Sequence, residues 1–361
     1  EFGVPFTIFG VENPWENPFA WLSLIKSALA LLILPNHYPN MLVLETGADK
    51  PGDLSRILRI ATPDAVVVTR LPEISVHVEA YASPEAVREE EFSPALALSR
   101  GAPLIVPADD SYALPMAFQT TARVISYGAS ESATVRITDA DFYEEEGSVA
   151  GMKGRVTMGG ETGMVLAKGS VGTTQLLPLS AALAAAKAFD IPLSEALEAL
   201  ESYEPPPGRG RLLMGRNGSF LVDDSYNASP AAVEEALATL KAFPHAKRRI
   251  AVLGDMLELG RYSVMEHERI GALASEVADV VVCVGIRARA YTTTPGDSRC
   301  IPFENARAAA AGLKDFVQEG DVILVKGSQS VRMERIVEAL LAKPEDASKL
   351  VRQEKEWKRR T

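Results

Sequence analysis

Residues 220–230 read FLVDDSYNASP, and this stretch indicates how the second half of the chain folds. Its first three residues are apolar, as expected for a short buried strand, and polar residues follow them directly. Ser229 then suits the N-cap of a helix, and Pro230 suits its first position. Apolar residues at helical spacing continue over 230–243. The stretch therefore predicts a strand, a polar loop and a helix in direct succession.

The same alternation recurs towards the C-terminus. Apolar runs rich in β-branched residues lie at 250–253, 280–284 and 322–325, and this pattern is typical of buried parallel strands. Helical patterns follow at 264–277, 304–317 and 331–342. Four such alternations predict a doubly wound, Rossmann-like α/β domain. Because ligands bind beyond the carboxyl ends of parallel strands, the polar residues there mark one candidate ligand edge.

The first half is also predicted to be α/β. Short alternating runs with glycine turns, from 121 to 168, predict antiparallel strands appended to a parallel sheet. The remaining elements are expected as strands at Met41–Glu45, Ala65–Thr69 and Leu104–Val106, and as helices at 51–61, 176–190 and 192–203.

Three consecutive prolines, Pro205–Pro207, are expected to separate two domains, because proline continues neither a helix nor a central strand. The predicted division is a domain at 1–204, a hinge at 205–211, a second domain at 212–342 and a charged tail at 343–361. The tail is expected to be a solvated helix or a frayed end.

The composition excludes several classes of protein. The 361 residues are 47% hydrophobic and 24% charged, which indicates a globular chain, and the net charge of −11 argues against coating nucleic acid. Two cysteines cannot build a disulfide framework or an all-cysteine zinc site, so a cytoplasmic location is expected. The most apolar stretch, Phe19–Leu34, has 16 residues, fewer than the about 20 that span a membrane. We expect a buried or hairpin helix there, and the alternative is an interfacial membrane helix.

Polar residues near predicted strand ends are candidates for chemistry. Arg209 follows the prolines and could clamp a phosphate, although a plain surface arginine is the alternative. Asp224 and Asn227 could bind a ribose or base, or could simply shape the turn. Glu45 at a strand end is the kind of ligand that Mg²⁺ prefers, whereas an isolated His77 favours a structural role. No complete G-x-x-x-x-G-K-[ST] phosphate loop occurs in this sequence.

Four blocks occur in a fixed order: PGR at 207–209, VDDSYNASP at 222–230, IAVLGDMLELG at 250–260 and VKGS at 325–328 with Met333-Glu334. In the first half they are preceded by LETGADKPGD at 44–53, HVEAY at 77–81 and ADD at 108–110. Together they resemble the Mur ligase family, most closely its MurF-type branch, which adds D-alanyl-D-alanine to UDP-N-acetylmuramoyl-tripeptide. The resemblance covers nearly all of 1–342 and implies that an N-terminal domain and the phosphate loop precede Glu1.

The resemblance implies a Mur-ligase-like central ATP-binding domain followed by the Rossmann-like domain. It implies a monomeric, cytoplasmic enzyme of peptidoglycan precursor synthesis that uses ATP and Mg²⁺ to join D-Ala-D-Ala to the UDP-muramoyl peptide through an acyl phosphate. Arg209, Asp224, Tyr226 and Asn227 would contact nucleotide, Glu45 and His77 the metal, and Asp255, Glu258, Lys326 and Ser328 the substrate; Arg209, Lys326, Glu90 and Glu91 are the catalytic candidates.

Three departures from the family pattern open a second hypothesis. The run SPEAVREEE at 83–91 lacks the family's carbamylated lysine; Glu90 or Glu91 could imitate its charge, or could lie on a solvated acidic helix face. TQLLP at 174–178 replaces the family's H-N-x-x-N, and Thr69-Arg70 stands where the family has T-N. The alternative is therefore a catalytically impaired, Mur-ligase-like module that binds nucleotide or a partner. A ligase for another acid–amine pair, such as a folylpolyglutamate type, agrees less well with the second-half blocks.

Overall fold

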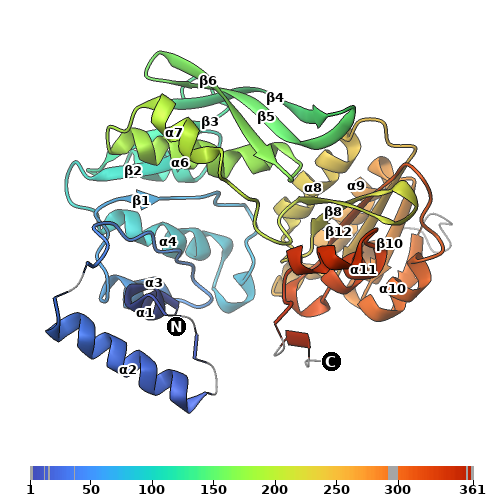
Figure 1. Cartoon of the computed structure of the whole chain (residues 1–361), viewed down its shortest axis with the longest axis horizontal. Helices are drawn as coiled ribbons and strands as arrows, with labels where there is room; N and C mark the ends of the chain where they lie inside the picture. Colours follow the sequence, from blue (N-terminus) through green and yellow to red (C-terminus); the bar gives the residue numbers. More distant parts are fainter. Residues whose placement is uncertain are drawn as a thin grey trace.

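The computed structural model describes residues 3–11, 13–14, 17–35, 37–291, 300–354 and 357–358. Within these residues the architecture rests on two six-stranded sheets, one in each half of the chain. Figure 1 shows the first sheet, with strands β1 to β6, on the left and above, and the second sheet, with β7 to β12, on the right. The predicted α/β fold class, with one sheet in each half of the chain, is therefore confirmed.

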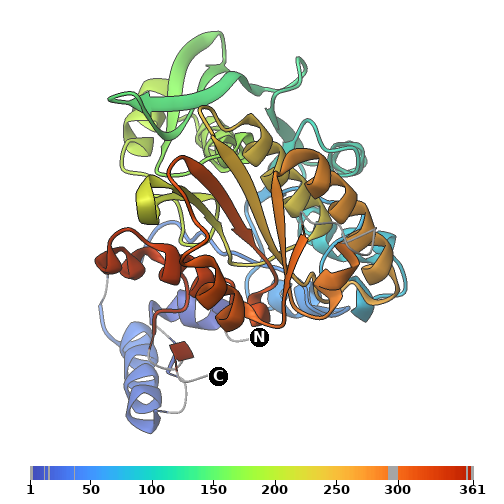
Figure 2. The same cartoon turned by 90° about the vertical axis from the view of Figure 1, so that its right-hand side faces the viewer.

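The second sheet has the strand order β11-β10-β9-β12-β8-β7, and β7 alone of these runs antiparallel to its neighbour. Successive residues of a strand point to opposite faces, so Leu324 packs in one apolar cluster and Ile323 in another. Helices α8 and α9 contribute to the first cluster, and α10 and α11 to the second. The domain is thus doubly wound, as predicted, and Figure 2 turns it towards the viewer.

The elements of the second half are β7 Arg211–Met214, β8 Phe220–Asp224, α8 Pro230–Ala242, β9 Arg248–Gly254, α9 Ser263–Val277, β10 Val280–Val284, β11 Cys300–Phe303, α10 Ala306–Leu313, β12 Asp321–Lys326 and α11 Glu334–Leu340. Short 3₁₀ turns lie at Arg216–Gly218, Gly260–Tyr262, Arg287–Tyr291, Gln329–Val331 and Pro344–Lys349. The Ser229 side chain accepts a hydrogen bond from Ala232 N at 3.3 Å, which confirms the predicted N-cap of α8.

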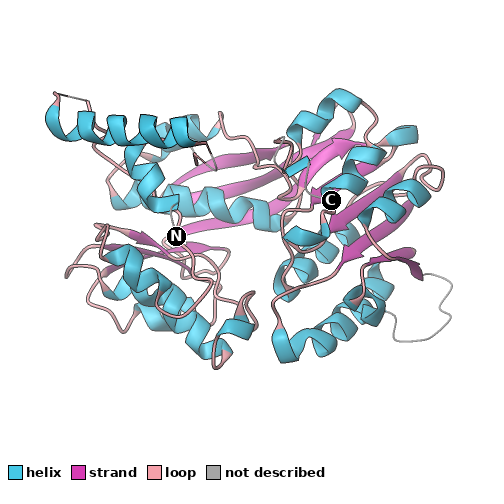
Figure 3. Cartoon of the chain, turned by 90° about the horizontal axis from the view of Figure 1, so that it is seen from below, coloured by secondary structure: helices cyan, strands magenta, loops and turns pink. Residues whose placement is uncertain are grey.

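The first sheet has the order β1 to β6, in which β1 to β4 are parallel and β4 to β6 antiparallel. The appended antiparallel strands are therefore confirmed, and Figure 3 shows the strands of both sheets in magenta. Phe142 of β4 meets Phe243 at the end of α8 edge to face, at 5.4 Å between ring centroids, so the two halves share an apolar contact.

The elements of the first half are α1 Gly3–Phe9, α2 Pro18–Ile33, α3 Asp53–Leu58, β1 Val66–Val67, α4 Pro84–Leu96, β2 Pro103–Pro107, α5 Ala113–Ala117, β3 Arg123–Gly128, β4 Val135–Glu145, β5 Ser148–Met158, β6 Glu161–Lys168, α6 Leu176–Ala188 and α7 Leu193–Leu200, with 3₁₀ turns at Val78–Ala80 and Thr173–Gln175.

The predicted strand at Met41–Glu45 is wrong. These residues have no regular secondary structure, and Val43 is 86% exposed. A β-strand needs a neighbour for its backbone N–H and C=O groups, and β1 pairs with β2 rather than with this segment. An apolar run alone therefore does not establish a strand.

The apolar stretch at 19–34 is helical, as predicted, and Asn17 caps α2 by accepting hydrogen bonds from Phe19 N and Ala20 N. Its predicted burial is wrong, because no residue of α2 is buried and Phe19 is 81% exposed. Figure 1 shows α2 at the periphery, and Trp21 packs edge to face on Phe6 of α1 at 5.9 Å. In the part of the chain that the structure describes, no helix has the length and apolarity needed to cross a membrane.

The prediction of a solvated C-terminal tail is wrong for its middle part. Leu350, Val351 and Arg352 are all buried. Leu350 joins the apolar cluster of α10 and α11, and Ala347 packs against it, so apolar residues within this charged segment give it a surface to bury. Residues 350–352 of the tail therefore pack against the second half of the chain instead of extending into solvent.

Candidate functional site

The carboxyl ends of β8, β9 and β12 form the predicted ligand edge. Lys326 at the end of β12 lies beside Asp224 at the end of β8 in the sheet register. Next to them, β9 and β12 approach so closely that a Cβ on Gly327 would lie 3.0 Å from the Gly254 Cα. Glycine is needed here because any larger residue would push the two strand ends apart.

Lys326 is buried and binds within the protein. Its Nζ donates to Asp224 Oδ2 at 2.6 Å and to the Asn227 carbonyl at 3.0 Å. The Lys326 ammonium therefore fixes both ends of the loop at 224–227. The structure thus brings together three predicted site residues, Lys326, Asp224 and Asn227. Lys326 holds the other two in place.

The segment predicted to be the hinge, 205–211, contacts the same loop. Gly210 N donates to Asp224 Oδ1 at 3.2 Å, and Tyr226 N donates to the Gly208 carbonyl at 3.1 Å. The Arg209 guanidinium lies over the Tyr226 ring at 4.1 Å, and Tyr226 is 40% exposed. A half-exposed aromatic ring beside an exposed arginine can take a base and a phosphate respectively.

Asp255 and Ser328 shape the neighbouring loop. The Ser328 Oγ accepts from Leu257 N at 2.8 Å, and Ser328 N donates to the Asp255 carbonyl at 3.0 Å. Asp255 Oδ1 in turn accepts from Ala288 N at 2.7 Å. These contacts present Glu258, which is exposed, towards the first half of the chain.

His77 joins the two halves of the chain. Its Nδ1 lies 2.6 Å from Glu258 Oε2, and its Nε2 lies 3.5 Å from Asp49 Oδ1. Arg70 also connects the two halves, through an ion pair with Glu235 at 2.8 Å. The predicted metal residue His77 and the predicted substrate residue Glu258 are therefore direct neighbours.

The other acidic candidates bind backbone. Glu91 accepts from Ala48 N at 3.2 Å in the loop that follows Glu45, and Glu90 accepts from Leu54 N at 3.0 Å in the first turn of α3. Burial raises the pKa of Glu91. Neither side chain lies on a solvated helix face, which was the alternative interpretation. Glu45 itself is exposed, and among the described residues no three His, Cys, Asp or Glu side chains form a group that could bind a metal ion.

One site-forming residue, His267, was missed by sequence reasoning. It is buried on α9, its Nε2 accepts from Met256 N at 3.0 Å, and its Nδ1 lies 2.6 Å from the Ser263 carbonyl. Burial lowers the pKa of His267, so the neutral ring with a proton on Nδ1 fits both contacts. A single histidine at a helical position gives no signal of this contact.

Asp223 is also buried beside the site. Its Oδ1 accepts from the Ser225 hydroxyl at 2.5 Å and from Ser225 N at 3.2 Å, whereas its Oδ2 has no partner among the described atoms. Burial raises the pKa of Asp223 to about 6, although the hydrogen bonds from Ser225 act in the opposite direction. The folded protein therefore binds this proton more tightly than the unfolded chain does.

We expect Asp223→Asn to become relatively more stable as the pH rises. A raised carboxyl pKa means that wild-type stability is lost between about pH 4 and pH 6, by up to about 3 kcal/mol for two pKa units. Asparagine keeps an oxygen for Ser225 and does not ionise. Urea unfolding at pH 4.5 and pH 7.5 measures the change, with exposed Asp315→Asn as control. An Asp223→Asn difference that is the same at both pH values would contradict the prediction.

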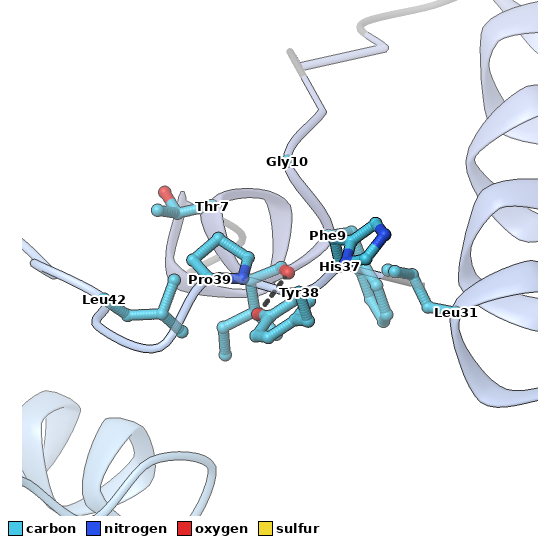
Figure 4. Close-up of a pocket in the computed structure, with 9 residues that line it drawn as sticks. Thr7, Phe9, Gly10, Leu31, His37, Tyr38, Pro39 and Leu42 are labelled. Atoms are coloured by element: carbon cyan, nitrogen blue, oxygen red, sulfur yellow. Dashed lines mark hydrogen bonds between the residues drawn. The ribbon is translucent and has the colours of Figure 1, made fainter. Parts of the chain in front are cut away.

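A shallow cavity of about 200 Å³ lies apart from these residues, between α1, α2 and the segment at 37–42. Figure 4 shows it, with the Tyr38 hydroxyl donating to the Ile8 carbonyl at 2.6 Å. Its lining includes Phe9, Leu31 and Leu42 but none of the predicted site residues. The cavity and the strand-end residues are therefore separate features of the molecule.

Two family models match the chain and cover most of it. "Mur ligase middle domain" matches residues 7–186, and "Mur ligase, glutamate ligase domain" matches residues 208–329. The chain belongs to the Mur ligase family. The three prolines Pro205–Pro207, at which a hinge is predicted, fall between the two matched regions.

This Mur ligase chain is similar to curated proteins named UDP-N-acetylmuramoyl-tripeptide–D-alanyl-D-alanine ligase. It is 27% identical to the one from Bacillus subtilis (strain 168) over 322 residues, which are 88% of this chain and 67% of that protein. It is 28% identical to the one from Mycobacterium tuberculosis (strain ATCC 25618 / H37Rv) over 328 residues, 83% of this chain and 62% of that protein. The chain thus spans about two thirds of the length of these relatives.

Solved structures share the Mur ligase fold. The MurF ligase from Thermotoga maritima in complex with ADP matches with a TM-score of 0.73 and 24% identity, over 93% of this chain and 75% of that chain. MurF from Acinetobacter baumannii matches with a TM-score of 0.73 and 21% identity, over 88% of this chain and 68% of that chain. The predicted fold class and family are confirmed.

Proposed function

We propose that this chain supplies the ATP-binding and C-terminal domains of a MurF-type ligase. The reaction joins D-Ala-D-Ala to UDP-N-acetylmuramoyl-tripeptide. ATP transfers its γ-phosphoryl group to the peptide carboxylate, giving an acyl phosphate and ADP; the D-Ala-D-Ala amine then attacks the acyl carbon, and inorganic phosphate leaves as the amide forms. The names of the curated relatives support this assignment. We assign 1–204 and 212–342 as the two domains and 205–211 as the hinge between them.

The observation that carries the proposal is the convergence of three segments at one strand edge. Three segments with separate motifs meet here: Arg209 lies over the Tyr226 ring, Gly210 N donates to Asp224, and Lys326 pairs with Asp224. An ATP base would stack near Tyr226, and Arg209 would bind phosphate oxygens. Positioning and charge neutralisation are the main contributions a protein makes to phosphoryl transfer.

Mg²⁺ is proposed as the accompanying ion, because it offsets phosphate charge during such transfers. The carboxylate of Glu45 is a suitable hard ligand, but among the described residues no three His, Cys, Asp or Glu side chains form a group that could bind a metal ion. No step is therefore assigned to the ion. We further propose that the enzyme acts as a cytoplasmic monomer on these small-molecule substrates, without nucleic acid or membrane contact.

The test is ligation by the complete gene product. We expect phosphate release from ATP that requires both UDP-muramoyl-tripeptide and D-Ala-D-Ala, and that falls strongly in Glu45→Ala. Omission of either substrate is the matched control. Nucleotide binding without any release would instead identify the catalytically impaired module, which the named relatives do not favour.

A further inference from the structure

The buried arginine of the C-terminal tail contacts the proposed nucleotide loop directly. Arg352 Nη2 donates to the Tyr226 carbonyl at 2.6 Å, and its Nη1 lies 3.4 Å from the Ser225 carbonyl. The same Nη1 donates to Glu334 Oε2 at 3.1 Å, so one planar guanidinium connects the loop to the start of α11. No block of the sequence that resembles the Mur ligases includes this residue.

The surroundings of Arg352 show that it is closely packed and paired. Glu334 is buried and also accepts from Arg332 Nε at 2.5 Å, so two arginines share one carboxylate. Arg352 adopts a left-handed backbone with φ of 58°, which a non-glycine residue adopts rarely. Such local strain persists where the surrounding contacts determine the conformation, and it concentrates at functional sites.

The tail, the hinge and the loop meet at one point. A Cβ on Gly208 would lie 3.0 Å from both Val351 Cγ1 and Tyr226 N, so the hinge backbone fits between the tail and the loop. The Arg352 guanidinium lies 5.6 Å from the Tyr226 ring centroid, and Arg209 lies over the same ring at 4.1 Å. The Tyr226 ring is thus contacted by two arginines, Arg209 before the loop and Arg352 in the tail.

We propose that Arg352 is a positioning residue for ATP binding. Its guanidinium fixes the Tyr226 backbone, and the Tyr226 ring is thereby held where it can contact the nucleotide base. This inference rests on the proposed function, because it takes the Tyr226 site as the ATP site. Arg352 does not itself touch the substrate. Its effect passes through two carbonyl groups that a guanidinium can bind together with Glu334 and that a single ammonium group cannot bind in the same geometry.

Lysine at this position separates positioning from structural support. Arg352→Lys keeps a positive charge beside Glu334 but loses the planar guanidinium and its several N–H donors. We expect its melting temperature to stay within a few degrees of wild type, while its Kd for ATP, measured by calorimetry on the complete gene product, rises about tenfold. The KM for ATP should rise in parallel, with kcat and the KM for D-Ala-D-Ala within about twofold of wild type.

The matched controls are Lys349→Ala and Arg352→Ala. Lys349 lies in the same tail, is 48% exposed and pairs with Asp346 rather than with the loop, so its loss should leave the Kd for ATP unchanged. Arg352→Ala removes the buried cation and should lower both stability and ATP affinity. Arg352→Lys that binds ATP as wild type does would overturn the inference while leaving the ligase intact. Wild-type protein that fails to bind ATP would overturn the proposed function, and this inference with it.

Discussion

Lys326→Met is expected to lower the free energy of unfolding by about 3 kcal/mol. The Lys326 side chain is 3% exposed and its carboxylate partner Asp224 is 17% exposed, at 2.6 Å. Removing the ammonium leaves Asp224 charged and unpaired in a site with little water, and leaves the Asn227 carbonyl without this donor. Urea unfolding at pH 7, followed by circular dichroism, measures the loss.

An exposed pair of similar geometry is the control. Lys247 lies 2.9 Å from Glu319, but the two side chains are 64% and 78% exposed, so Lys247→Met should change stability by less than about 0.5 kcal/mol. The double variant Asp224→Asn with Lys326→Met should lose less than Lys326→Met alone, because no unpaired charge remains. Equal losses in Lys326→Met and Lys247→Met would show that the buried pair does not stabilise the strand edge.

The second half of the fold could be predicted because its signals are local and repeated. Runs such as Ile250–Leu253 are apolar throughout, as a strand covered on both faces requires, and β9 lies where the run predicts. Met41–Glu45 has similar apolar character without forming a strand, since strand formation depends on a neighbour that the run itself does not specify. Phe19–Leu34 shows the same limit, because its composition predicts the α2 helix but not whether anything covers it.

The candidate site was predictable as a set of motifs but not as a set of contacts. Position at a strand end places Asp224 and Lys326 at one edge. Their pairing, across 102 residues, depends on β12 lying next to β8, and sequence order does not show that adjacency. The His77–Glu258 contact depends further on how the two halves meet. Arg352 was missed because a charged tail carries no motif, and only its burial reveals its contacts.

Arg209→Ala is expected to lower kcat/KM for ATP about 100-fold, because an arginine that binds transferring phosphate oxygens stabilises charge that develops during transfer. Arg209 is exposed and its described contact is the Tyr226 ring, so its loss should change the free energy of unfolding by less than about 0.5 kcal/mol. Phosphate release measures the first effect and urea unfolding the second.

Arg209→Lys distinguishes charge from geometry at the same position. Lysine keeps the charge but cannot bind phosphate bidentately or stack as a plane on Tyr226, so an intermediate loss of about tenfold is expected. Arg216→Ala, an exposed arginine in the turn between β7 and β8, removes the same charge far from the strand-end site and should leave turnover unchanged. Because Arg209 belongs to the hinge and Tyr226 to the loop that Lys326 positions, turnover that survives Arg209→Ala would mean that this convergence serves to connect the domains and that ATP binds elsewhere.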